Sequence, residues 1–253
     1  MGKAQTFVGR PVRIGRFELL LDEYVPTAWL AARLTEQRTS TQVPRILQPM
    51  TLPNGTPVMF KRVGPSRNRH GWLSRLNAAH RLKPRFAAAE GRALQDFWNA
   101  SLPVPRLLGY GEQWRFGIRG DGLVLSEYLP LPTVQVELAR TGCEALWLRW
   151  FALIARIHAA GYAHGDCDTD NFLMRPTGEL LAIDLEKAGS LTPKLQRKDV
   201  LRALRCRIEA DGGASACTEL LYVYAKHCKL PQTGAQLVET ALGRYKPAES
   251  QQS

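Results

Sequence analysis

The chain has 253 residues, of which 45% are apolar and 23% charged, and its formal net charge is +11. This length can bury a sizeable core and suits one large domain or two lobes that share a cleft. No stretch approaches the roughly 18 apolar residues of a membrane-spanning helix, and the N-terminus lacks the apolar core of a signal peptide. We therefore expect a cytoplasmic protein whose five cysteines are free thiols.

The positive charge is concentrated in one segment. Nine Lys or Arg and a single acid, Glu90, stand between Lys61 and Arg92. We expect the 61–92 segment to form a patch that attracts a polyanion: an anionic membrane surface, an anionic glycolipid or a nucleic acid. A solvated helical face without a partner is the alternative.

The first half of the chain is strand-rich. Asn54-Gly55 is a strong hairpin signal between two runs that alternate in polarity. Gly120-Asp121 is expected to join a further pair of strands. The predicted elements are a strand at 11–22, a short helix from Pro26, two strands within 45–63, a helix at 86–100, and strands at 105–119 and 122–128.

The second half is mostly helical. Pro130 and Pro132 mark a break that suits a hinge. A strong helix follows at 144–160, then a polar loop, a hairpin around Pro176-Thr177-Gly178, and helices over about 193–245. Strands first and helices later predict a two-lobed α+β fold, with a strand-rich lobe over residues 1–128 and a compact helical lobe over 129–253.

The loop and hairpin carry the most specific chemical pattern. Asp166 is followed by Asn171 after five residues and by Asp184, at the end of an apolar run, after thirteen more. This spacing is typical of phosphoryl transfer from ATP. We expect Asp166 to accept the proton of an acceptor hydroxyl, and Asn171 and Asp184 to bind Mg²⁺.

Two residues of the first lobe suit a phosphate clamp. Lys61 is expected near the end of a strand, where its ammonium reaches the α- and β-phosphates of ATP. Glu90, on the next helix, is expected to pair with Lys61 and to orient it. Taken alone, Lys61 is better read as one surface lysine of a basic stretch; its place upstream of the HGD, Asn171 and Asp184 set favours the clamp.

The run LVLSEYL at 123–129 ends at the expected hinge. Backbone groups of Glu127 and Leu129 are expected to bind the adenine edge, with Ser126 lining the back of the pocket. The alternative is an ordinary buried strand.

The order of Lys61, Glu90, LVLSEYL, HGDxxxxN and IDLEKA resembles the protein-kinase-like superfamily. Within it, the stretch from about 45 to 190 is most similar to the lipopolysaccharide kinase (Kdo/WaaP) family. The resemblance implies ATP-dependent phosphorylation of a Kdo or heptose hydroxyl of the lipopolysaccharide core, at the cytoplasmic face of the inner membrane.

The chain departs from regulated protein kinases in several places. No Gly-rich loop precedes Lys61, and Asp184-Leu185-Glu186 stands in place of DFG. HGD replaces HRD, and Asp168 stands where protein Ser/Thr kinases usually carry Lys. These departures favour a small-molecule or glycolipid acceptor over a protein.

Three other functions stay open on the sequence. A RIO-like atypical protein kinase lying against RNA would use the basic segment equally well. An aminoglycoside- or choline-type phosphotransferase would need a longer helical lobe and a more acidic acceptor pocket. A pseudokinase would bind a partner without transferring phosphate.

Overall fold

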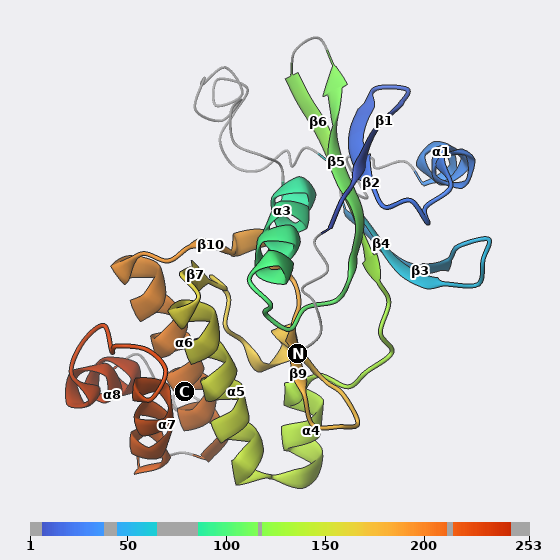
Figure 1. Ribbon diagram of the computed structural model, residues 1–253. Helices are drawn as coiled ribbons and strands as arrows, with labels where there is room; N and C mark the ends of the chain where they lie inside the picture. Colours follow the sequence, from blue (N-terminus) through green and yellow to red (C-terminus); the bar gives the residue numbers. More distant parts are fainter. Residues whose placement is uncertain (1–6, 38–44, 65–85, 116–117, 212–214, 244–253) are drawn as a thin grey trace, which may run out of the picture. The chain divides into compact units, whose positions relative to one another are not determined.

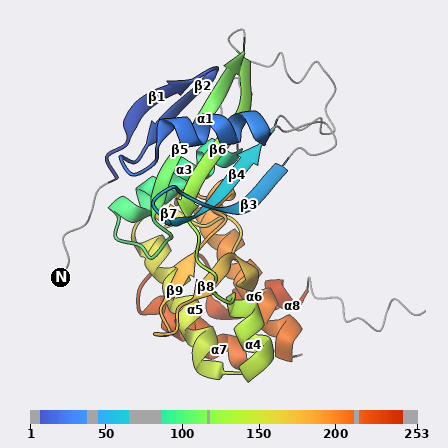
Figure 2. The ribbon, with the colours of Figure 1, turned by 90° about the vertical axis from the view of Figure 1, so that its right-hand side faces the viewer.

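The computed structural model describes residues 7–37, 45–64, 86–115, 118–211 and 215–243. By its internal contacts the chain forms two compact units, Met1–Pro130 and Leu131–Ser253. Figures 1 and 2 show the sheet of the first unit and the helices of the second. Within the described ranges, every helix is too short or too polar to traverse a lipid bilayer.

The first unit is built on a six-stranded antiparallel sheet in the order β1-β2-β5-β6-β4-β3. Its strands are β1 (Arg10–Ile14), β2 (Phe17–Leu21), β3 (Arg45–Thr51), β4 (Pro57–Val63), β5 (Leu107–Arg115) and β6 (Ile118–Glu127). The hairpin predicted at Asn54-Gly55 joins β3 to β4. Asn54 accepts a hydrogen bond from the Thr56 amide (3.1 Å), and Gly55 has a φ of 86°.

Two helices cover opposite faces of this sheet (Figure 2). α1 (Thr27–Glu36) places Leu30 and Leu34 in a core with Phe60, whereas α3 (Phe86–Asn99) packs on β4, β5 and β6. Successive side chains of a strand point to opposite faces. Since Phe60 faces α1, its neighbour Lys61 faces α3.

Two strand predictions were wrong in detail. The single strand expected at 11–22 is a hairpin, because Gly15, with a φ of 58°, turns the chain between β1 and β2. Gly120 and Asp121 lie inside β6 and do not form the turn between β5 and β6. Asp121 is retained there by a long-range ion pair with Arg62, which local turn propensity does not reveal.

The second unit is mainly helical. Its helices are α4 (Val134–Thr141), α5 (Glu144–Ala159), α6 (Pro193–Asp211), α7 (Ser215–Ala225) and α8 (Gly234–Leu242). Its short strands are β7 (Tyr162–Ala163), β8 (Phe172–Met174), β9 (Leu180–Ala182) and β10 (Gly189–Ser190), and its 3₁₀ turns are η2 (Thr169–Asn171) and η3 (Leu185–Lys187). β8 and β9 form the predicted hairpin.

α5 forms the centre of this unit. Its buried face carries Trp150, Phe151 and Ile154, and Trp150 contacts the ring of Phe172 on β8 edge-on, at 5.8 Å between centroids. This packing fixes the hairpin against α5, so the loop between α5 and β8 is held at both ends. The polar loop that carries Asp166 and Asn171 is that loop.

Candidate active site

Lys61 and Glu90 form a buried ion pair in the first unit. Lys61 is 3% exposed and Glu90 7%, and their side chains meet between β4 and α3. Burying two charges costs free energy that their attraction seldom repays in full, so such a pair is weak evidence for a stabilising role. The reading of Lys61 as a surface lysine is excluded by its burial.

The neighbouring Arg62 is also inside the protein. It pairs with Asp121 (Nε to Oδ2, 2.7 Å) and donates to the carbonyl oxygens of Leu34 (2.9 Å) and Gln37 (2.6 Å), where α1 ends. The expectation that Lys61 and Arg62 belong to a basic surface patch is therefore wrong, because each is buried against a carboxylate.

Of the other seven cations in the 61–92 segment, Arg92 is exposed. The remaining six, at positions 67, 69, 75, 81, 83 and 85, lie outside the described residues.

The residues expected to bind adenine lie at the end of β6. Ser126 pairs in register with Met59, and the Glu127 amide donates to the Arg106 carbonyl at 2.8 Å. The N–H of Glu127 is therefore engaged within the sheet. Leu129 follows the strand and is half-buried.

In the second unit, hydrogen bonds join the segments that carry Asp166, Asn171 and Asp184. The Asn171 side-chain amide donates to the Asp166 carbonyl (3.0 Å), and the Asn171 carbonyl accepts from the Ile183 amide (3.0 Å). Ile183 immediately precedes Asp184. The loop and the end of the β8–β9 hairpin are thus tied together through Asn171.

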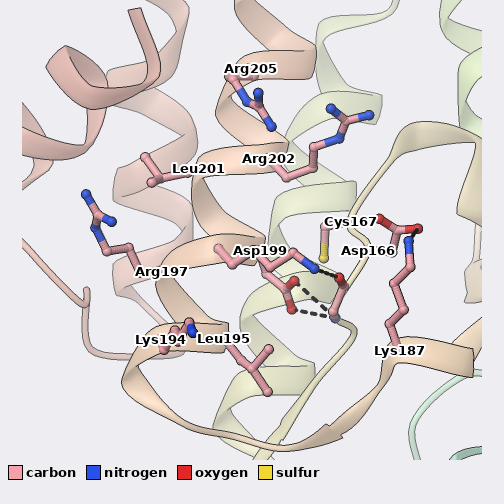
Figure 3. Close-up of a pocket in the computed structure, with 12 residues that line it drawn as sticks. Asp166, Cys167, Lys187, Lys194, Leu195, Arg197, Asp199, Leu201, Arg202 and Arg205 are labelled. Atoms are coloured by element: carbon pink, nitrogen blue, oxygen red, sulfur yellow. Dashed lines mark hydrogen bonds and ion pairs between the residues drawn. The ribbon is translucent and has the colours of Figure 1, made fainter. Parts of the chain in front are cut away.

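Asp184 has a left-handed backbone conformation, with a φ of 54°. A non-glycine residue in this region is strained, and such strain is concentrated at functional sites. From Asp184 the chain turns through η3, and the Nζ of Lys187 lies 2.7 Å from Oδ2 of Asp166 (Figure 3). This hydrogen bond raises the pKa of Lys187 and keeps its ammonium charged.

Gly165 is required by a close backbone approach. Its φ is 80°, and a Cβ built on it would lie 2.2 Å from the carbonyl oxygen of Lys187. The residue before Asp166 therefore has to be glycine if η3 is to pack against the loop. This packing explains the glycine of the HGD sequence, which stands where regulated kinases carry arginine.

A buried network holds the same glycine from the other side. Asp199 on α6 is 0% exposed and accepts the Gly165 amide on both carboxylate oxygens (3.0 and 3.1 Å). It also lies 3.2 Å from His158 Nε2, and His158 Nδ1 lies 2.6 Å from the Tyr224 hydroxyl. α5, α6 and α7 together position the Asp166 loop.

His164 is a structural residue. It is fully buried and its Nε2 lies 3.1 Å from the Ile183 carbonyl. Burial lowers the pKa of His164, although the Asp199 carboxylate opposes this shift. The imidazole is therefore neutral in the folded protein at pH 7.

The neutral state of His164 predicts a pH-dependent stability. The unfolded residue takes up a proton near its ordinary pKa of about 6.5, whereas the folded residue does not. The free energy of unfolding is therefore highest above about pH 6.5 and falls as the pH drops below that value. The total loss is about 1.4 kcal/mol for each unit by which folding lowers the pKa of His164.

Urea unfolding between about pH 7.5 and pH 5 measures this effect. His164→Asn should flatten the profile, and His227→Asn, at an exposed position, is the control. Equal slopes for wild type and His164→Asn would contradict the assignment.

Asp168 is held by an ion pair. Both carboxylate oxygens of Asp168 meet the guanidinium of Arg202 on α6, with 2.7 Å between Oδ2 and Nη2. A bidentate pair fixes the planes of both groups. Asp168 is thereby occupied in anchoring the loop to α6.

These features can be compared with known proteins. The model of the lipopolysaccharide kinase (Kdo/WaaP) family matches residues 69–224, more than half of the chain. The chain belongs to this family. The resemblance seen in the sequence is thus confirmed, and the family match extends through α6 into α7.

Two relatives of the Kdo/WaaP family are similar to the chain. The 3-deoxy-D-manno-octulosonic acid kinase of Xylella fastidiosa (strain M12) is 25% identical over 153 residues, which are 59% of this chain and 58% of the relative. The match thus spans less than two thirds of that kinase.

The second relative is a solved structure of WaaP in complex with acyl carrier protein. It has a TM-score of 0.61 and 18% identity, and the match covers 89% of this chain and 93% of that chain. At this identity the likeness shows the fold, and the predicted two-lobed kinase-like α+β fold is confirmed.

Sequence reasoning overlooked two residues beside Asp166 in this family member. Lys187 stood in the quoted IDLEKA string, but nothing in the string indicated that its ammonium turns back to Asp166. Asp199 had a detectable signal, since it is a single acid directly before the apolar positions Val200 and Leu201 of a helix. Such an acid on a buried face requires a buried partner.

Proposed function

We propose that the protein is an ATP-dependent kinase that phosphorylates a sugar hydroxyl, of Kdo or heptose, in the lipopolysaccharide inner core. The observation that carries this proposal is the linkage of Asp166, Asn171 and the Asp184 segment inside the region matched by the Kdo/WaaP family. The name of the Xylella relative supports a sugar-acid acceptor.

The residues present fit Mg²⁺ and ATP. The Asn171 side-chain nitrogen is engaged with the Asp166 carbonyl, which leaves the amide oxygen as a ligand atom, and Asp184 offers a carboxylate. Oxygen ligands of this kind are those that Mg²⁺ prefers. When bound, Mg-ATP supplies the phosphoryl group and neutralises the charge of its phosphates.

Each residue has a separate role in this proposal. Asp166 accepts the proton of the acceptor hydroxyl, through Oδ1 because Oδ2 is engaged by Lys187. Lys61 binds the phosphates and is held in place by Glu90. Ser126, Glu127 and Leu129 line the adenine site, with residues 1–130 as the nucleotide lobe and 131–253 as the catalytic lobe.

Lys187 supplies positive charge beside Asp166. Protein Ser/Thr kinases usually carry a lysine two residues after the catalytic aspartate, at the position that Asp168 occupies here. Lys187→Gln should lower kcat by roughly a hundredfold, the loss typical when one donor to a charged transition state is removed. Lys187→Arg should retain part of the activity because it keeps the charge. Steady-state kinetics with varied ATP and acceptor measure both variants.

The matched control for Lys187 is Lys229→Gln, at an exposed lysine of the same unit. A kcat for Lys187→Gln equal to that of Lys229→Gln would contradict a role for the Lys187 ammonium.

We place the enzyme in the cytoplasm, peripheral to the inner membrane, where the acceptor glycolipid is made. An anionic membrane surface or the glycolipid itself is the partner proposed for the cations of the 61–92 segment other than the buried Lys61 and Arg62. Acyl carrier protein is a further candidate partner, because a WaaP structure is described in complex with it. Family membership favours the glycolipid over RNA, the partner of the RIO-like alternative.

The test is incubation of the protein with labelled ATP and a series of core-truncated lipopolysaccharides, followed by mass analysis of the products. Addition of one phosphate to an inner-core sugar is expected. Autophosphorylation together with tight, salt-dependent RNA binding, and no transfer to any glycolipid, would instead favour the RIO-like function. No binding of Mg-ATP in a thermal-shift assay would favour a pseudokinase.

A further inference from the structure

A cavity of about 450 Å³ lies within the second unit, beside the carboxylate of Asp166 (Figure 3). One wall is the Gly165–Cys167 loop with Lys187 of η3, and the other is formed by α6 between Lys194 and Arg205. The cations that line it are Lys187, Lys194, Arg197, Lys198, Arg202 and Arg205. The only acids in this lining are Asp166 and the fully buried Asp199.

Three of the six cations are matched by partners in the structure. Lys187 pairs with Asp166, Arg202 pairs with Asp168, and Arg197 donates to the Gln232 side-chain oxygen at 2.7 Å. The carboxylates neutralise the charges of Lys187 and Arg202, and Gln232 gives Arg197 a neutral hydrogen-bond acceptor.

The other three cations, like Arg197, have no carboxylate partner among the residues that the structure describes. Lys198 donates to the Gly165 carbonyl, which carries no net charge, and no ion pair is formed by Lys194 in the described ranges. The Nε of Arg205 is buried and has no hydrogen-bond acceptor in this part of the chain. Since this nitrogen is closed to solvent, its missing acceptor adds to the cost of holding the Arg205 charge beside the cavity.

The position of these cations on the helix adds to that cost. Lys194 lies in the first turn of α6, which has no acidic residue, and Lys198 follows one turn later. The N-terminal end of a helix carries partial positive charge, so cations are unfavourable there and anions favourable. Residues four apart share a face, which gathers Lys194, Lys198 and Arg202 on the cavity side.

We propose that this cavity binds the anionic group of the acceptor, a sugar carboxylate or a phosphate of the glycolipid, while a hydroxyl of the same molecule lies at Asp166. The inference rests on the proposed kinase function. A carboxylate or phosphate held by Lys194, Lys198 and Arg205 gains charge-assisted hydrogen bonds. An acceptor without that anion leaves these cations unmatched, so the cavity selects for acidic acceptors.

The test uses Lys194→Gln and Arg205→Gln, with Lys229→Gln, an exposed lysine outside the cavity lining, as the control. The acceptors are lipid A carrying the sugar acid, its carboxyl methyl ester, and its dephosphorylated form. Each cavity variant should raise the KM for the acidic acceptor about tenfold, the effect of one lost charge-assisted hydrogen bond, with the KM for ATP unchanged. Arg205→Lys should recover part of the loss.

The three acceptors identify which anion is bound. If the carboxylate is bound, the methyl ester should have a tenfold higher KM with wild type and no further rise with the variants. If a phosphate is bound, the dephosphorylated acceptor should instead have the tenfold higher KM with wild type and no further rise with the variants. A rise in the KM for ATP, or variants equal to wild type with all acceptors, would overturn the proposal.

A separate titration distinguishes failure of the cavity from failure of the kinase function. The free sugar acid and inorganic phosphate are titrated by calorimetry into wild type and Arg205→Gln, without ATP. Weaker binding of either probe to the variant supports the cavity even if wild type transfers phosphate to no glycolipid. Equal binding to both proteins overturns it, whatever the kinase assay shows.

Discussion

Asp166→Asn should lower kcat about a thousandfold, within the range that a positioned general base contributes. The amide is the same size as the carboxylate but does not accept the proton of the acceptor hydroxyl. The backbone carbonyl that receives the Asn171 side chain is kept, so the loop should retain its conformation. The KM for ATP should change little, since the proposed nucleotide contacts lie on other residues.

The measurement is initial-rate phosphorylation of the glycolipid acceptor, with thermal unfolding of the same samples. Asp170→Asn is the matched control, because Asp170 is an exposed aspartate of the same loop. An unchanged kcat for Asp166→Asn would remove Asp166 from the reaction. If Asp166→Asn and Asp170→Asn lose the same activity, the effect comes from the negative charge of the loop and not from a specific general base.

Asp199→Ala should destabilise the second unit by about 3 kcal/mol, the lower end of the cost of removing one partner from a buried charged contact. The carboxylate is 0% exposed, and its loss leaves the Gly165 amide and His158 Nε2 without their acceptor. Asp199→Asn keeps one oxygen and should cost less. Both variants should also lower kcat, because Gly165 immediately precedes Asp166.

Urea unfolding and hydrogen exchange of the Gly165 amide measure this prediction. Tyr224→Phe is the comparison at the far end of the same network. It removes the hydroxyl that lies 2.6 Å from His158 and should cost only about 1 kcal/mol, with the Gly165 amide still protected. Equal exchange of that amide in Asp199→Ala and Tyr224→Phe would show that Asp199 does not hold the loop.

The elements that could be predicted are those governed by local physics. Asn54-Gly55 forms a hairpin turn because the Asn54 side chain accepts a hydrogen bond from the Thr56 amide and Gly55 adopts a positive φ. α1 begins directly after Pro26, which suits the entrance of a helix. α5 shows its buried face as a repeat of apolar residues. These signals act over a few residues, so a single sequence is enough to detect them.

Two of the mistaken readings, unlike the missed turn at Gly15, depend on distant partners. Asp121 reads as a turn residue, yet Arg62, fifty-nine positions earlier, retains it inside β6. Arg62 reads as a surface charge, because charge counts contain no information about burial. Asp121, from another element, pairs with it inside the protein, and only the folded chain brings that carboxylate near. The pairing of Lys61 with Glu90, by contrast, agrees with the expectation from the sequence.

By itself, the sequence determined the order of the chemical groups, Lys61, Glu90, Asp166, Asn171 and Asp184, and through it the kinase-like family. Spacing along the chain is sufficient for this prediction, because few other families of enzymes carry these residue types in this order and at these separations. The tertiary structure alone decided what surrounds Asp166. Lys187 reaches it through the strained turn at Asp184, and Asp199 and the cations of α6 reach the same loop from a helix that begins nearly thirty residues later. Those contacts arise from packing between elements; the local pattern around Asp199 indicates that this acid is buried but not which groups it contacts.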